Sequence, residues 1–110
     1  MNRGDVVYVN LDLVIGSEIG KKRPAIVIQN DMANRTSPTV TIVPLSTSVR
    51  RIYPFQVLIP AGEGGLTRPS KALCEQVRTV SRQRLAGHLG SVSAERLREI
   101  RAALDRHLWL

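Results

Sequence analysis

Short apolar runs, some of them nearly unbroken and some with every second residue apolar, recur along the chain and are typical of β-strands. β-branched and aromatic residues, which pack well on a pleated sheet, are concentrated in five short runs. In the fourth run, Phe55, Val57 and Ile59 occupy every second position and would therefore share one face of a strand. The five strands are expected at residues 6–11, 24–29, 39–45, 53–59 and 71–80.

The spacing of apolar residues becomes helical toward the C-terminus. Leu97, Ile100 and Leu104 recur at intervals of three and four, which places them on one face of a helix. Ser93 precedes this segment and is a residue type that commonly caps the first turn of a helix. Helices are expected at residues 94–108 and, in a shorter form, at residues 81–89.

Glycine-rich or polar stretches separate these elements. Loops are expected at residues 12–22 and 60–68, which both contain several glycines, and a polar connection is expected at residues 30–38. No linker or internal repeat divides the chain, so we expect one domain over residues 1–110. Its class would be α+β and mainly β, in the form of a small barrel or strongly curved sheet with helices outside.

The charge of the chain indicates that its partner is a polyanion. Lys and Arg number 16 against 9 Asp and Glu, giving a net charge of +7, and most of the cations are Arg, whose planar guanidinium suits phosphate. The excess remains when the C-terminal helix is left out. It predicts attraction to nucleic acid or to an acidic protein partner.

The cysteine and histidine contents argue against disulfide-stabilised and metal-binding classes of protein. Cys74 is the only cysteine, so no internal disulfide and no cysteine-based zinc site can form. His88 and His107 are far apart in the sequence, and the phosphate-binding and dinucleotide-binding glycine motifs are absent. We therefore expect no metal site and no cofactor. Without a secretory signal or a run long enough to span a bilayer, we expect a soluble cytoplasmic protein and no membrane partner.

Residue types at the predicted strand ends suit phosphate chemistry. Arg23 stands directly before Pro24, which fixes its own φ and biases Arg23 toward extended backbone, so the cation would be held at the rim of a strand. Cleavage of RNA through its own 2′-hydroxyl needs a proton acceptor, a proton donor and cations for the charge that builds on phosphorus. This scheme requires no metal. The candidates are Arg23, Ser46, Thr47, Glu75, Gln76 and Arg78.

Simpler interpretations of the same residues remain open at this point. Exposed Arg, Ser and Glu are usually solvated, and Glu75 is equally suited to an ion pair with Arg78 or Lys71 on a strand face. Cys74 fits the core better than it fits the role of a nucleophile. The cations of two turns can contact RNA phosphates or can simply be solvated, and these are Lys21, Lys22, Arg50 and Arg51.

Six short motifs also occur in a fixed order along nearly the whole chain. They are RGDVV at residues 3–7, GSE with KRPA at 16–18 and 22–25, VPLST at 43–47, YPF at 53–55, GGL at 64–66 and LCEQVRTV at 73–80. In this order and spacing the chain resembles the MazF/PemK (Kid) family of toxin endoribonucleases. The resemblance implies a homodimeric SH3-like barrel that cleaves single-stranded RNA at short sequences without metal. It also implies inhibition by an antitoxin whose acidic, extended tail occupies the RNA groove.

The resemblance assigns roles to individual residues. Arg23 matches the catalytic arginine, and Ser46 stands where the family usually has threonine, with Thr47 as the neighbouring alternative. Leu73 replaces a second catalytic arginine found in one branch, whose aspartate base aligns with Glu75. Arg23 would then both stabilise charge and protonate the leaving oxygen. The residues expected to bind RNA are Glu18, Lys21, Lys22, Arg50, Arg51, Gln76 and Arg78.

Two other functions are compatible with the same barrel. A gyrase-poisoning, CcdB-type relative would act by binding protein alone, and a non-catalytic RNA-binding barrel would bind RNA in a salt-dependent manner and leave it intact. The arginine–proline and hydroxyl motifs favour the ribonuclease over both. For the expected homodimer, a barrel edge is favoured over packing through the helix.

Overall fold

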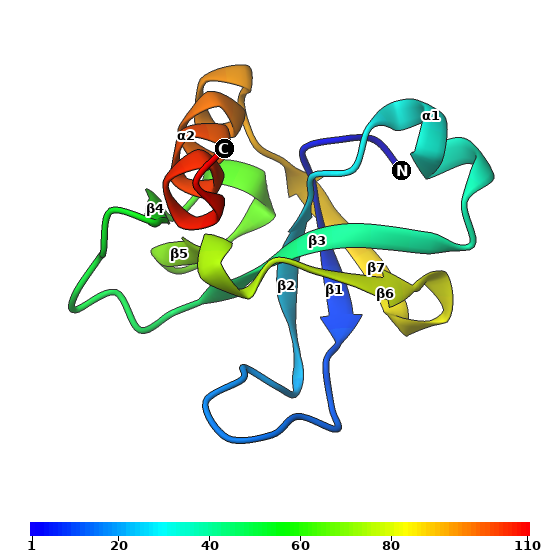
Figure 1. The fold of residues 1–110 in the computed structure, drawn as a ribbon, viewed down its shortest axis with the longest axis horizontal. Coiled ribbons are helices and arrows are strands. Elements are labelled where there is room, and N and C mark those ends of the chain that lie inside the picture. Colours follow the sequence, from blue (N-terminus) through cyan, green and yellow to red (C-terminus); the bar gives the residue numbers. More distant parts are fainter.

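In this computed structural model, which describes all residues 1–110, the β-branched runs form one bent antiparallel sheet (Figure 1). Its strands follow the order β4-β5-β3-β2-β1-β7, and β6 pairs separately with β3. The mainly β fold with a C-terminal helix is as expected. The strands are β1 (Asp5–Asn10), β2 (Lys22–Val27), β3 (Thr39–Ser46), β4 (Gln56–Ile59), β5 (Ser70–Leu73), β6 (Arg78–Ser81) and β7 (Leu85–Ser91).

The central strand β3 pairs with β2 along one edge and with two different strands along the other. Its first half pairs with β6, up to Ile42 opposite Arg78, while its last two residues pair with β5. Between these neighbours the chain forms the short 3-10 turn η2 (Cys74–Gln76), opposite the part of β3 that contains Pro44. Proline has no N–H to donate to a ladder. The expected continuous strand at residues 71–80 is therefore wrong, because η2 interrupts it.

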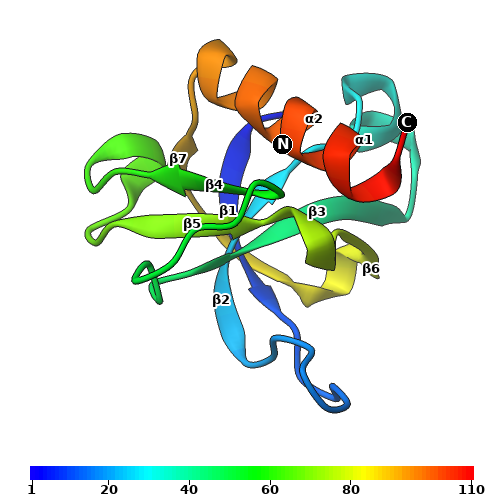
Figure 2. The same ribbon diagram turned by 60° about the vertical axis from the view of Figure 1, so that its left-hand side comes forward.

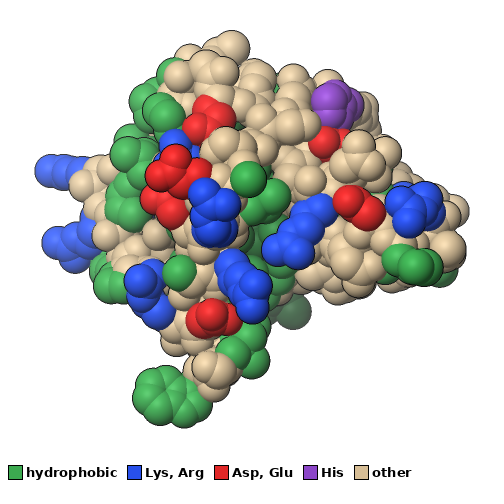
Figure 3. Space-filling model, turned by 90° about the horizontal axis from the view of Figure 1, so that it is seen from above, with side chains coloured by type: hydrophobic (Ala, Val, Ile, Leu, Met, Phe, Trp, Pro, Cys, Tyr) green, Lys and Arg blue, Asp and Glu red, His purple; other side chains and the backbone are tan.

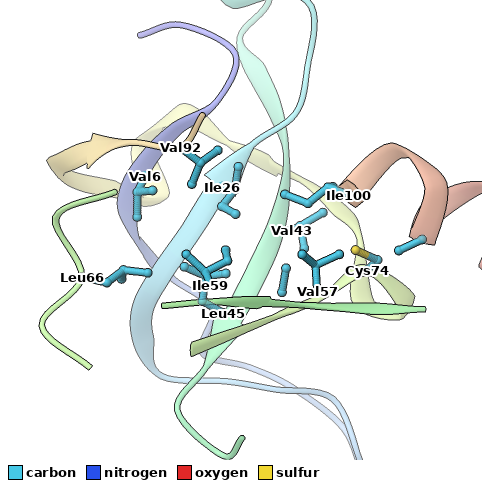
Figure 4. Close-up of a cluster of buried hydrophobic side chains, with 12 residues drawn as sticks. Val6, Ile26, Val43, Leu45, Val57, Ile59, Leu66, Cys74, Val92 and Ile100 are labelled. Atoms are coloured by element: carbon cyan, nitrogen blue, oxygen red, sulfur yellow. The ribbon is translucent and has the colours of Figure 1, made fainter. Parts of the chain in front are cut away.

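Side chains of the sheet alternate between two hydrophobic clusters. Ala25 and Val27 of β2 enter one cluster, whereas Ile26 enters the other, larger one. Figure 4 shows the larger cluster, in which Ile100 of the C-terminal helix meets the strands. Cys74 is fully buried there, and burial raises the pKa of its thiol to about 12, so it is a core residue.

The C-terminal helix α2 (Ala94–Leu108) forms where the sequence predicted it. The Ser93 hydroxyl caps the first turn by accepting from the Arg96 N–H at 3.1 Å. The helix lies across the edge of the sheet near β4 (Figure 2). Its own residues Ile100 and Ala103 are buried against the sheet. The Arg96 guanidinium also forms a two-point ion pair with Glu63 of the turn η1 (Glu63–Gly65), at 2.9 and 3.1 Å. None of the helices combines the length and apolar character needed to cross a membrane.

Two connections differ from expectation. The polar stretch at 30–38 contains the helix α1 (Asp31–Thr36), capped by the Asn30 side chain, which was missed because six mainly polar residues show no apolar period. The helix expected at 81–89 is wrong: the chain there forms the turn η3 (Arg82–Arg84) and then β7. Pairing of β7 with β1 overrides the local helical propensity of this segment.

Candidate active site

Arg23 is held in place by backbone oxygens. It lies on β2 opposite Val9 of β1, and its side chain is partly buried. The Nε of Arg23 donates to the Gly20 carbonyl at 2.6 Å, and Nη1 donates to the Leu45 carbonyl at 3.4 Å. Burial lowers the pKa of the guanidinium from its usual value, which makes release of a proton easier than in water. The structure thus fixes the cation that the arginine–proline motif indicated.

Ser46 and Thr47 point to different sides of the sheet. The β2–β3 ladder ends where Ala25 faces Pro44, and the bond from Arg23 Nη1 to the Leu45 carbonyl then brings Arg23 to the residue that precedes Ser46. Thr47 instead lines a hollow of about 160 Å³ together with Pro24, which alternates with Arg23 and lies on the opposite face. The geometry therefore brings Ser46, rather than Thr47, toward Arg23.

The Ser46 hydroxyl has a defined orientation. Its Oγ accepts a hydrogen bond from the Ser48 N–H at 3.1 Å. This bond uses a lone pair of the hydroxyl oxygen and leaves the hydroxyl proton free to be donated. A donor beside a guanidinium is suited to binding a phosphate oxygen.

A second part of the site is a surface hollow of about 540 Å³ between the first loop and η2. It brings together four residues that the sequence singled out from two distant segments of the chain. Glu18 comes from the loop at residues 11–21, while Glu75, Gln76 and Arg78 come from η2 and the start of β6. The remaining lining residues are Ile15, Ser17 and Val77.

One loop connects Arg23 to this hollow. The N–H of Ile19 donates to Oε1 of Gln76 at 2.7 Å, and the next residue, Gly20, supplies the carbonyl that accepts from Arg23. Two adjacent residues of the loop thus bond to the two halves of the site. This link, which sequence spacing does not reveal, places Arg23 next to the hollow that Glu75 lines.

Glu75 does not form the ion pair that the simpler interpretation would require. Its Oε2 accepts from Nε2 of Gln56 at 2.7 Å, and Lys71 instead donates to the Arg51 carbonyl at 2.8 Å. Arg78, the other candidate partner, forms no ion pair. The remaining oxygen of Glu75, Oε1, is buried without any hydrogen-bond partner. Because this oxygen has almost no access to solvent, a substrate would reach it only after the side chains around it move.

Gln56 is a site residue that the sequence interpretation missed. It is 8% exposed, and its Oε1 accepts from the Tyr53 N–H at 3.1 Å while its Nε2 holds Glu75. Buried polar side chains need such partners, because an unpaired amide inside a protein costs free energy. A glutamine between the apolar residues Phe55 and Val57 was the available signal.

The other basic residues lie around these hollows. Lys21 and Lys22 are exposed where the first loop enters β2. Arg50 and Arg51 line a separate basic hollow of about 560 Å³. Figure 3 shows the opposite side of the molecule from the first loop, over α2 and α1, where Lys and Arg side chains are also spread over the surface. No three His, Cys, Asp or Glu side chains come together in a group able to hold a metal ion.

Comparison with known proteins identifies the family. The family model described as PemK-like, MazF-like toxin of type II toxin-antitoxin system matches residues 2–108. The chain is 41% identical to endoribonuclease MazF9 of Mycobacterium tuberculosis, covering 98% of this chain and 96% of that protein.

Two solved structures share the fold. MazF from Deinococcus radiodurans superposes with a TM-score of 0.87 at 28% identity, covering 100% of this chain and 97% of that one. An endoribonuclease in complex with its cognate antitoxin, from a mycobacterial species, superposes with a TM-score of 0.82 at 25% identity, covering 100% and 96%. The chain therefore belongs to the PemK-like, MazF-like toxins of type II toxin–antitoxin systems.

Proposed function

We propose that this protein, a MazF-type toxin endoribonuclease, cleaves single-stranded RNA at a short sequence by attack of a 2′-hydroxyl on the adjacent phosphate. Cleavage of messenger RNA, or of ribosomal or transfer RNA, would then inhibit translation and growth. The observation that carries the proposal is the fixed guanidinium of Arg23, which is held by the carbonyls of Gly20 and of Leu45, the residue before Ser46. A cation fixed before the substrate arrives loses little energy to rearrangement during the reaction.

The proposed mechanism divides the reaction among three residues. Glu75 accepts the proton of the 2′-hydroxyl while that oxygen forms a bond to phosphorus. Arg23 stabilises the negative charge that builds on the phosphate oxygens, and Ser46 donates a hydrogen bond to one of them. The bond from phosphorus to the 5′-oxygen then breaks, and this oxygen takes up a proton that Arg23 is proposed to donate. The products carry a 2′,3′-cyclic phosphate and a 5′-hydroxyl, and no metal ion is needed.

The surrounding polar residues are proposed to bind the RNA strand. Glu18, Gln76 and Arg78 line the same hollow as Glu75, where amide and carboxylate groups can contact base edges and a guanidinium can contact phosphate. Lys21 and Lys22 are exposed where the first loop enters β2, next to Arg23, and would attract the strand electrostatically.

An antitoxin and a second copy of the chain are the proposed protein partners. The related mycobacterial endoribonuclease was solved with its cognate antitoxin, and the net charge of +7 here suits an acidic, extended tail lying in the RNA groove. For the homodimer we favour the barrel edge. The strand β4 pairs on one side only, and Leu58 on it is 45% exposed.

A direct test is incubation of the purified protein with a mixture of single-stranded RNAs in excess EDTA. We expect cleavage at one short sequence, with the rate unchanged by the chelator. Sequencing of the 5′ ends of the fragments gives the recognised sequence. Binding of RNA without cleavage of any sequence would contradict the proposal and would favour a non-catalytic RNA-binding barrel. Inhibition of gyrase without RNA cleavage would favour the gyrase-poisoning alternative.

A further inference from the structure

A second basic hollow adjoins Ser46 and is not used by the mechanism above. Its volume is about 560 Å³, and its lining comes from the β3–β4 connection and from β5. Ser48, which lines it, donates its N–H to the Ser46 hydroxyl, and Lys71, which also lines it, pairs with Ser46 in the β3–β5 ladder. The full lining is Ser48, Arg50, Arg51, Tyr53 and Lys71.

This hollow combines cations with an exposed aromatic ring. Tyr53 is 42% exposed, and its ring stacks on Phe55 with the centroids 5.5 Å apart and the planes 2° from parallel. The Arg51 guanidinium lies 5.8 Å from the centre of the Tyr53 ring and donates to its hydroxyl at 3.3 Å. Phe55 thus stacks on the ring while Arg51 holds it at its hydroxyl end, and part of the ring still faces solvent.

The three cations differ in their freedom to bind a ligand. Lys71 is fixed by its bond to the Arg51 carbonyl at 2.8 Å, and the guanidinium of Arg51 is directed toward Tyr53. Arg50 is exposed and forms no side-chain hydrogen bond or ion pair with the protein. An ordered ring beside a free cation is complementary to a nucleotide, because the flat base can stack on the ring and the phosphate can bind the cation.

We infer that the Arg50–Tyr53 hollow is a subsite for a nucleotide that flanks the cleaved bond, with its base stacked on Tyr53 and its phosphate contacted by Arg50 and Lys71. The inference rests on the proposed function, because it places this nucleotide next to the phosphate at Ser46. Single-stranded RNA is favoured over an acidic peptide because a peptide carboxylate would use the cations and leave the ring unused. Stacking accepts any base, so the subsite would contribute affinity more than sequence preference.

Binding of modified RNA strands tests this inference. The probe is a single-stranded RNA containing the cleaved sequence, made non-cleavable by a single 2′-deoxy sugar before the scissile bond. In a companion series one base at a time is removed at each flanking position. We expect the protein to bind the strand about five- to hundredfold more weakly when one particular flanking base is absent, the range typical of a stacked base.

The variant Tyr53→Ala should lose the same factor with the intact strand and should show no further loss when that base is removed. Tyr53→Phe keeps an aromatic ring and should bind as the unmodified protein does. Tyr8→Ala removes another exposed tyrosine, on the hollow that contains Thr47, and should remain sensitive to the missing base. Thermal unfolding of each variant checks that the fold is retained.

Three results would overturn the subsite. The first is unchanged RNA binding by Tyr53→Ala, and the second is an equal loss at every abasic position, which would indicate a general disturbance. The third is weakened inhibition by the antitoxin with RNA binding intact, which would assign the ring to a peptide. Because the readout is binding, the subsite can fail while the unmodified RNA is still cleaved, and that result would contradict the subsite and leave the proposed function standing.

Discussion

Replacing Arg23 with alanine is expected to reduce RNA cleavage by about a hundredfold to a thousandfold, with little effect on RNA binding. The reason is that the charge which the guanidinium stabilises builds up only as the phosphorus–oxygen bonds rearrange. Loss of an interaction made mainly in the transition state lowers kcat and leaves KM nearly unchanged. The measurement is the single-turnover cleavage rate of a defined RNA strand over a range of protein concentrations.

The Arg23 bonds to the Gly20 and Leu45 carbonyls also support the first loop, so a control must separate loop support from catalysis. Arg84 offers a match, because its guanidinium donates to the carbonyls of Asn10 and Asp12 at the other end of that loop. Arg84→Ala should keep cleavage of the same order as the unmodified protein. Arg23→Lys should recover only part of the activity, since lysine keeps the charge but lacks the planar fork. Full activity of Arg23→Ala would remove this residue from the mechanism.

The substitution Glu75→Gln is expected to lower the cleavage rate by about a hundredfold to ten-thousandfold, the range typical of a lost general base. Glutamine has the same size as glutamate, and its carbonyl oxygen can still accept the hydrogen bond from Gln56, so the fold should be kept. Its amide cannot take up the 2′-hydroxyl proton. As for Arg23, the loss should lie in kcat, and thermal unfolding should confirm that the variant is folded.

Glu75 has an alternative role that the same experiment distinguishes. If it only orients Gln56, then Glu75→Gln should retain activity and Gln56→Ala should lose it. If Glu75 is the base, Glu75→Asp should keep a measurable fraction of the rate, because the carboxylate remains but is one methylene shorter. Retained cleavage by Glu75→Gln would contradict the proposed role.

The regular elements of this fold could be predicted because their signals are local. Runs of β-branched and other apolar residues located the strands β1, β2 and β3 to within a few residues, and the Ser93 cap with its helical apolar spacing gave the limits of α2. Apart from the short polar helix α1, the failures depended on distant pairing. The break at η2 lies opposite Pro44 of β3, and β7 forms from a helix-favouring segment because β1 supplies a partner. Neither partner is visible from the residues of the segment itself.

The candidate site was predictable in its residue types but not in its connections. Pro24 indicated a fixed cation at Arg23, yet its carbonyl partners Gly20 and Leu45 depend on how the loop folds back. The sequence alone did not decide between Ser46 and Thr47, because the choice depends on how the end of β3 lies relative to Arg23 of β2. Gln56 escaped notice because its importance comes only from Glu75, which is 19 residues away in the chain.

The central claim, attack by the RNA's own 2′-hydroxyl at the Arg23–Ser46–Glu75 site, is tested most directly with one modified strand. An RNA containing the cleaved sequence is synthesised with a single 2′-deoxy sugar immediately before the scissile bond, and its cleavage is compared with that of the unmodified RNA. The account predicts a 2′,3′-cyclic phosphate and a 5′-hydroxyl on the products of the unmodified strand, and no cleavage of the deoxy strand at that bond. Cleavage of the deoxy strand at the same position would contradict it.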